Sequence, residues 1–192
     1  MALPMRQCSV SKQAQDRLKP AYEDLFKKLL NATQHGLPHE PIPRPLLEDN
    51  EEIREANLER LWDLGGFNFT RTSHQNSIRI PNSASILVSN YQDIYLDRKS
   101  NEAVYAFWRR KVGERIKDPE KRALLAPVVP PHVFGGKRPS LEQRFYEVLS
   151  QNNVDLVDTK ATPILEIHEH GLKTSEKDYE FDVLIFATGS HN

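Results

Sequence analysis

The sequence is poor in cysteine, in long apolar runs and in excess charge of either sign. Its 192 residues include one cysteine, Cys8, which excludes an internal disulfide and a cysteine-rich metal site. No apolar run is long enough to cross a bilayer, and residues 1–6 lack the apolar core of a secretory signal. These absences predict a cytoplasmic protein in a reducing environment, without a membrane partner.

The charges of the chain nearly cancel. There are 26 basic and 27 acidic side chains, for a formal net charge of −1. A general nucleic-acid binder needs a dominant basic face, so no nucleic-acid partner is expected. With 38% apolar residues, the chain can build one ordinary domain, or one domain and part of another.

Several familiar site motifs are also missing. No Gly-x-Gly-x-x-Gly turn occurs, so the sequence predicts no complete dinucleotide-binding fold. His168 and His170 lie two residues apart and could point the same way on a strand, but no third metal ligand is apparent. We interpret them as the solvated tip of a hairpin and predict no metal site.

Helical periodicity dominates the amino-terminal part of the chain. Apolar residues recur at helical spacing over 11–31, 50–64 and 100–117, and a short helical turn is expected after Asp118. Pro20 is unfavourable inside a helix, so the regular part of the first segment is expected to begin near it. The residues at this spacing in the second and third segments are Ile53, Ala56, Leu61 and Leu64, and Val104, Phe107, Trp108, Val112, Arg115 and Ile116.

Residues 70–89 differ from the helical segments around them. They are rich in serine, asparagine, threonine and isoleucine and have no clear period, which predicts a surface loop with a short strand at 85–88. A loop of this length is unusual inside a compact domain.

Strand patterns replace the helical ones after a helix predicted over 141–150. Residues 154–158 alternate as a half-buried strand does, and 164–167 with 171–174 predict a hairpin. The sequence therefore predicts an α/β class of fold, α+β within this segment, with part of a nucleotide-binding sheet.

A continuous apolar run at 181–187 predicts a central parallel strand that is buried on both faces. In open α/β sheets, ligands bind beyond the carboxyl ends of such strands. Thr188 and Gly189 follow this run, which makes them candidate binding residues.

The candidate site lies between the helical and strand-rich parts, at Phe134-Gly135-Gly136-Lys137-Arg138-Pro139. Two glycines allow a tight bend or the close approach of a ligand, and two cations follow at once. Ser140 and Gln143 have the spacing of a helix capping box, which would fix the cations on a rigid turn ahead of a helix. The cations suit an anionic ligand; the alternative is a solvated turn with two ordinary surface charges.

A series of motifs in this order resembles the flavin-dependent Baeyer–Villiger monooxygenases, particularly their fungal branch. The motifs are Gly-Gly-Lys-Arg-Pro at 135–139, Asn-Asn-Val-Asp-Leu-Val-Asp at 152–158, Thr-Pro-Ile-Leu-Glu-Ile at 162–167 and Glu-Phe-Asp-Val-Leu-Ile-Phe-Ala-Thr-Gly at 180–189. In the helical part, Asn-Leu-Glu-Arg-Leu-Trp at 57–62 and Phe-Trp-Arg at 107–109 are similar to the same family. The resemblance covers nearly the whole chain except 70–89.

The resemblance implies a flavoprotein with two dinucleotide domains that uses FAD, NADPH and O₂ to insert oxygen next to a ketone. An ester or lactone would form from a small-molecule ketone, in a pathway of secondary metabolism. It assigns Arg138 a catalytic place by the flavin, where its fixed charge would stabilise developing negative charge. It assigns Lys137 to the NADPH phosphate, and makes Gly136, Thr188 and Gly189 the other cofactor-binding residues.

The same resemblance implies that residues 1–130 form a helical insertion region. Residues 131–192 would form part of the NADPH domain and the strand that returns to the FAD domain. The glycine-rich turns of both cofactor domains are absent from the sequence, so a separate flavin-domain fragment is the expected partner. Ser190 stands where the family usually has an aromatic residue. The alternative is a truncated, non-catalytic remnant or a helical interaction module without cofactor.

Overall fold

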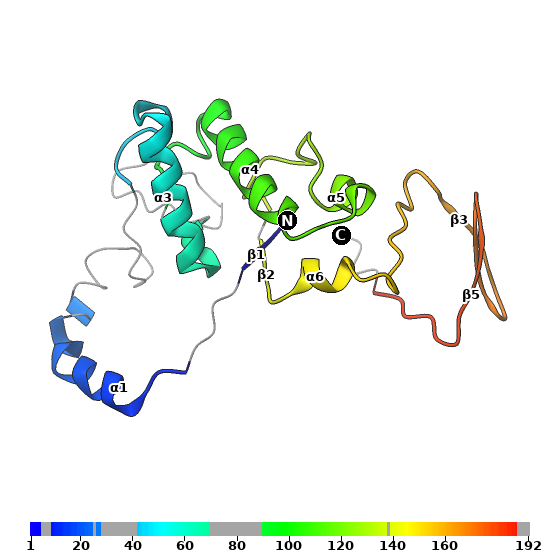
Figure 1. The fold of residues 1–192 in the computed structure, drawn as a ribbon, viewed down its shortest axis with the longest axis horizontal. Helices are drawn as coiled ribbons and strands as arrows, with labels where there is room; N and C mark the ends of the chain where they lie inside the picture. The colour runs from blue at the N-terminus through cyan, green and yellow to red at the C-terminus, as the bar shows by residue number, and fades with distance from the viewer. Residues whose placement is uncertain (5–8, 25, 28–41, 70–89, 138, 188–192) are drawn as a thin grey trace, which may run out of the picture. The chain divides into compact units, whose positions relative to one another are not determined.

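The chain divides into two compact units, Met1–Val148 and Leu149–Asn192. The computed structural model describes residues 1–4, 9–24, 26–27, 42–69, 90–137 and 139–187. Along these residues the elements are β1 (Ala2–Pro4), α1 (Lys12–Leu18), η1 (Lys19–Ala21), η2 (Leu46–Glu48), α3 (Glu51–Leu64), η3 (Gly66–Phe69), α4 (Arg98–Gly113), α5 (Pro119–Leu125), β2 (Ser140–Glu142), α6 (Phe145–Leu149), β3 (Ile164–His168), β4 (Gly171–Thr174) and β5 (Asp178–Glu180) (Figure 1). The strand predicted at 85–88, with its loop, lies outside the described residues. In the described part, no helix is long and apolar enough to cross a membrane, and no cluster of three metal-ligating side chains occurs.

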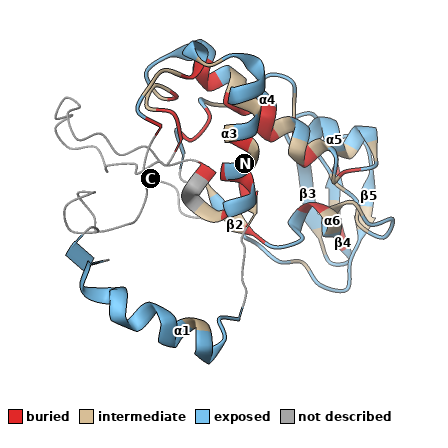
Figure 2. Cartoon of the chain, turned by 60° about the vertical axis from the view of Figure 1, so that its left-hand side comes forward, coloured by how far each residue is buried: buried red, intermediate tan, exposed pale blue. Residues whose placement is uncertain are grey.

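The first predicted helix forms, but it does not begin near Pro20. Helix α1 begins at Lys12, because the Ser11 hydroxyl caps it by accepting the Ala14 N–H at 3.2 Å. Pro20 lies in the first turn of η1, where a missing N–H removes no helical hydrogen bond. No residue of α1 is buried, and Leu18 keeps 51% of its surface exposed (Figure 2).

Helices α3 and α4 confirm the second and third helical predictions. The side chains of Asn50 and Asp97 cap their first turns, and Gly65 ends α3 with a φ of 65°. Asp118 likewise caps α5, with Pro119 in its first turn.

The buried face of α3 differs from the prediction. Leu58, Leu61 and Trp62 are buried, whereas Ile53 and Leu64 are about half exposed. Trp62 packs against Phe69 of η3 and Phe107 of α4, partners that the spacing within α3 alone does not identify. Helices α3 and α4 lie side by side (Figures 1 and 2), and ion pairs join Glu59 to Lys111 at 2.9 Å and Glu55 to Arg110.

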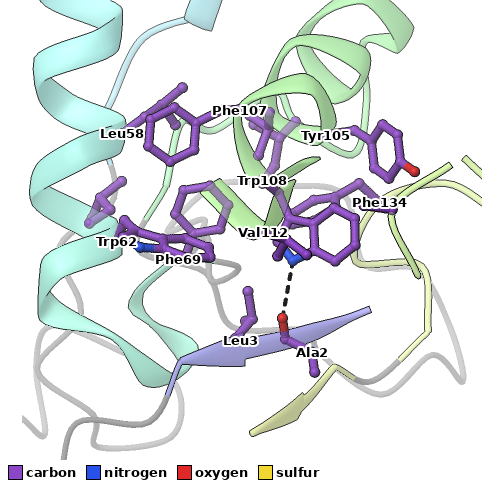
Figure 3. Packing of buried hydrophobic residues seen from close by; sticks show 14 of the residues in the cluster. Ala2, Leu3, Leu58, Trp62, Phe69, Tyr105, Phe107, Trp108, Val112 and Phe134 are labelled. Atoms are coloured by element: carbon purple, nitrogen blue, oxygen red, sulfur yellow. Dashed lines mark hydrogen bonds between the residues drawn. The ribbon is translucent and has the colours of Figure 1, made fainter. Parts of the chain in front are cut away.

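An aromatic cluster forms the core of the first unit. Phe69 stacks on Phe107 with ring centroids 5.4 Å apart and meets Trp62 edge-on, also at 5.4 Å. Trp108 stacks on Tyr105 at 5.4 Å (Figure 3). Phe134, from the candidate site, packs against Phe69, Tyr105 and Trp108. The core therefore reaches the predicted binding turn directly.

The predicted helix over 141–150 and its capping box are wrong at their start. Ser140–Glu142 is strand β2, which pairs in parallel with β1, with Leu3 opposite Leu141. The chain then bends at Arg144, whose φ is 60°, and α6 begins at Phe145. The Glu142 carboxylate accepts the Phe145 N–H at 2.9 Å, so Glu142 caps the start of the helix, the role that was predicted for Ser140.

The second unit is a small antiparallel sheet in the order β3-β4-β5. The hairpin of β3 and β4 is confirmed, with His168 opposite Gly171, and β5 was not predicted from the sequence. Residues 154–158 form no strand. The central strand predicted at 181–187 is not formed: this run pairs with no described strand, and Ile185 is 81% exposed. A strand that is buried on both faces needs a neighbouring strand on each side, and the described residues provide none for this run.

Candidate functional site

The predicted turn is fixed to the core at Phe134, whose ring is buried. The side-chain amide of Asn101 in α4 bridges both backbone groups of this residue. Its Oδ1 accepts the Phe134 N–H at 3.0 Å, and its Nδ2 donates to the Phe134 carbonyl at 3.0 Å. The Asn101 Nδ2 also donates to the Ile94 carbonyl at 2.7 Å, so the amide joins the turn to the segment that precedes α4.

The glycines of the turn are required by its geometry. Gly135 has a φ of 73°, in the left-handed region that favours glycine. A Cβ at Gly135 would lie only 2.2 Å from the Tyr95 hydroxyl oxygen, so Tyr95 covers this position. The Gly136 N–H donates to the Val133 carbonyl at 2.9 Å, which closes the turn. The backbone ahead of Lys137 is therefore held on two sides.

Alanine at Gly135 is expected to cost more stability than alanine at Gly66. Both glycines have positive φ, 73° and 58°, so each substitution carries a backbone cost of about 1 kcal/mol. At Gly66 a Cβ would meet nothing within 4 Å, whereas at Gly135 it would collide with Tyr95. Urea denaturation of Gly135→Ala and of the control Gly66→Ala measures the difference. Equal losses would show that Tyr95 does not restrict the turn.

A small pocket of about 170 Å³ opens beside the turn. Its lining includes Met1 and Leu3 from the β1 end, and Gly135, Lys137 and Ser140 from the turn and β2. Lys137 is exposed at this pocket. Burial lowers the pKa of the Met1 amino group, and the positive charge of Lys137 lowers it further. The exposed ammonium of Lys137 thus gives the pocket a positive charge, which suits an anionic ligand.

Strand β1 is anchored where it forms one wall of the pocket. The Trp108 indole Nε1 donates to the Ala2 carbonyl at 3.1 Å (Figure 3). The Tyr146 hydroxyl accepts the Ala2 N–H at 3.2 Å, and burial raises the pKa of Tyr146 to about 12, so the hydroxyl stays protonated at neutral pH. Two aromatic side chains therefore fix the backbone beside Leu3.

An ion network holds the other side of β2. Arg115 binds Glu142 at 2.7 Å (Nη1–Oε1) and Glu147 at 2.6 Å (Nε–Oε1). Its guanidinium also lies over the Tyr146 ring, 5.1 Å from the centroid. Hydrogen bonds from Arg115 hold the pKa of Glu147 below its usual range, and the two carboxylates raise the pKa of Arg115. The network keeps β2 and α6 in one arrangement.

The structure places two of the five predicted site residues. Gly136 and Lys137 lie exposed on the turn, whereas Arg138, Thr188 and Gly189 lie outside the described residues. Sequence reasoning missed Asn101, Tyr95 and the wall formed by β1. A signal for Asn101 was present, because it lies three residues before Val104 on the apolar stripe of α4, where a polar residue needs a buried partner.

Comparisons with known proteins give consistent relatives, although no family model matches the chain. Cyclopentanone 1,2-monooxygenase of Comamonas sp. (strain NCIMB 9872) is 40% identical over 98% of this chain and 31% of the relative. The FAD-binding monooxygenase acrE of Aspergillus aculeatus is 38% identical over 98% of this chain and 29% of the relative. The chain thus spans about a third of the length of the curated relatives it matches.

Solved structures show the same similarity. A cyclohexanone monooxygenase mutant from Rhodococcus sp. Phi1 bound to NADP⁺ matches with a TM-score of 0.79 at 29% identity, over 98% of this chain and 32% of that one. OTEMO in complex with FAD and NADP (form 2) matches with a TM-score of 0.78 at 28% identity, over 97% of this chain and 31% of that one.

Proposed function

Because the chain belongs to the flavin-dependent Baeyer–Villiger monooxygenase family, we propose that it supplies the NADPH-contacting turn of an enzyme that oxygenates a small ketone. The reaction would use FAD, NADPH and O₂ and give an ester or lactone. Among the relatives, one is named for cyclopentanone and one for cyclohexanone, so a cyclic ketone is the substrate class to test first. A cytosolic setting is part of the proposal.

One observation carries this proposal: side chains of the core hold the backbone of a turn that ends in an exposed lysine. Asn101 and Tyr95 hold the backbone of the turn, while Lys137 at its end is exposed at the pocket. An ordinary solvated turn needs no such support, since its backbone groups can bind water. A lysine ammonium is a point charge that suits a phosphate, and the neighbouring Gly136 is exposed and has no side chain to keep a nucleotide from the backbone.

Lys137 would hold the NADPH phosphate, and Arg138 would stabilise negative charge beside the flavin. FAD would supply the redox chemistry when bound, with Thr188 and Gly189 at the return toward its domain. Gly136 would let the nucleotide approach the backbone. Residues 1–130 would form the helical insertion region, and 131–192 would belong to the NADPH domain and the return strand.

A chimera tests the proposal with a readout for each role. The matching segment of the Comamonas cyclopentanone monooxygenase is replaced by residues 1–192, and flavin absorbance after dialysis and lactone formation are measured. We expect retained FAD and ketone-dependent oxidation of NADPH. Within the chimera, Lys137→Ala is expected to raise the KM for NADPH about ten-fold through the lost charged contact, and Arg138→Ala to abolish oxygenation.

Lys99→Ala is the matched control, because Lys99 is also exposed but does not line the pocket. It should leave the KM for NADPH unchanged. A folded chimera that retains no flavin would favour the cofactor-free remnant instead. Retained flavin with an unchanged KM in Lys137→Ala would overturn the role of Lys137 while leaving the proposed reaction in place.

A further inference from the structure

Asn101 stands out as a polar side chain on the apolar stripe of α4. It is 7% exposed and lies in helical spacing with Val104, Trp108 and Val112, which are buried. A buried amide brings little net stability over an apolar side chain, because it must be desolvated before its hydrogen bonds form. Its position therefore calls for a reason beyond filling the core.

The hydrogen bonds of Asn101 supply that reason. Phe134 lies in a turn, outside any helix or strand, and is itself buried. Its N–H and carbonyl would be left without partners in the core if Asn101 did not bind both, each at 3.0 Å. One side chain thus pairs with Phe134 as a neighbouring strand would, and fixes the peptide planes on both sides of it.

The next residues carry this fixed direction toward Lys137. Tyr95 covers Gly135, and the Gly136 N–H binds the Val133 carbonyl, so little freedom remains between Phe134 and Lys137. We propose that Asn101 is a positioning residue that sets the direction of Lys137 for binding a nucleotide phosphate. The identity of the ligand rests on the proposed function, whereas the effect of Asn101 on the conformation of the turn does not depend on it.

The test uses the full 192-residue chain with the substitution Asn101→Ala. Ser100→Ala is the matched control: Ser100 is also buried on α4 and loses a hydrogen bond, but its hydroxyl donates to Asp93 and not to the turn. Exchange of the Phe134 and Gly136 amide protons is followed by NMR at a temperature where all variants are folded. We expect exchange about ten-fold faster in Asn101→Ala through local opening, and little change in Ser100→Ala.

NADP⁺ titration provides the second readout, because a merely structural role would not separate these two variants in affinity. We expect NADP⁺ to bind about ten-fold more weakly to Asn101→Ala, as for Lys137→Ala, and normally to Ser100→Ala. Unchanged amide exchange in Asn101→Ala would overturn the proposal, as would unchanged affinity in a chain that binds NADP⁺ through Lys137.

The two proposals can fail separately. If wild-type chain and Lys137→Ala bind NADP⁺ equally poorly, the assignment of the nucleotide to this turn fails, while amide exchange still decides whether Asn101 fixes the turn. If Asn101→Ala does not fold, the isosteric Asn101→Asp carries the same comparison, because its carboxyl keeps an acceptor for the Phe134 N–H and removes the donor to the Phe134 carbonyl. The Phe134 and Gly136 amide protons of this variant should then exchange faster than in wild type but more slowly than in a turn without either bond to Asn101. Exchange as slow as in wild type would contradict the proposal.

Discussion

Trp108→Ala is expected to lower the free energy of unfolding by about 3–5 kcal/mol, the range for truncating a fully buried aromatic side chain. Trp108 has no exposed surface, stacks on Tyr105 and packs beside Phe134. Its indole also holds the Ala2 carbonyl, so the substitution removes both core volume and an anchor of β1. Urea denaturation followed by circular dichroism measures the loss, since the substitution also removes one of two tryptophan fluorophores.

Two further variants separate the causes. Trp108→Phe keeps most of the ring but removes the indole donor, so the Ala2 carbonyl keeps only the longer bond from the Tyr146 hydroxyl at 3.5 Å, and the expected cost is about 1 kcal/mol. Leu96→Ala is the control, because Leu96 is 73% exposed and its truncation should change little. A Trp108→Ala chain as stable as Leu96→Ala would contradict the described core.

The helices could be predicted from sequence because their signals are local. Capping by Asn50 and Asp118, termination at Gly65 and the apolar stripe of α4 all depend on residues a few positions apart. The face that α3 buries was predicted less well. It depends on where α4 lies, and the two helices meet through residues about fifty positions apart, such as Glu59 and Lys111.

The strands depended on distant partners and were predicted unevenly. The strands of the β3–β4 hairpin are neighbours in the sequence, with His168 paired to Gly171 three positions later, so the hairpin was found from its pattern. Strand β2 was interpreted as a helix because its partner is β1, at the opposite end of the sequence. The apolar run at 181–187 has the composition of a central strand, but composition provides no neighbour with which to pair.

The candidate site shows the same division. The glycines and cations of the turn could be found from the sequence, because their conformational freedom and charge are properties of the residues themselves. The support of the turn could not. Asn101 lies thirty-three positions before Phe134, and the wall at Leu3 comes from the amino-terminal strand. The chemistry of the site was local in the sequence, whereas its geometry was set by tertiary packing.

Arg115→Ala is expected to cost about 3 kcal/mol, because it leaves the buried Glu142 carboxylate without its cation. Arg115→Lys should recover only part, since an ammonium cannot bind Glu142 and Glu147 with the paired geometry of a guanidinium. Arg98→Ala is the matched control. Arg98 pairs with Glu102 on the surface of α4 with 90% of its side chain exposed, so the urea midpoint should not move.

The pH dependence of stability provides a second signature of this network. Arg115 depresses the pKa of Glu147 in the folded chain, so the carboxylate contributes stability above its unfolded pKa. That contribution is lost as the pH falls through the lower, folded pKa. Arg115→Ala removes the largest cause of the depression, so the folded and unfolded pKa values of Glu147 approach each other and the acid-side slope of stability becomes shallower. Urea midpoints measured from neutral to acidic pH for wild type, Arg115→Ala and Arg98→Ala test this. An unchanged slope in Arg115→Ala would show that the ion network does not link β2 to α6 in solution, and that hydrophobic packing around Tyr146 holds this wall of the pocket without it.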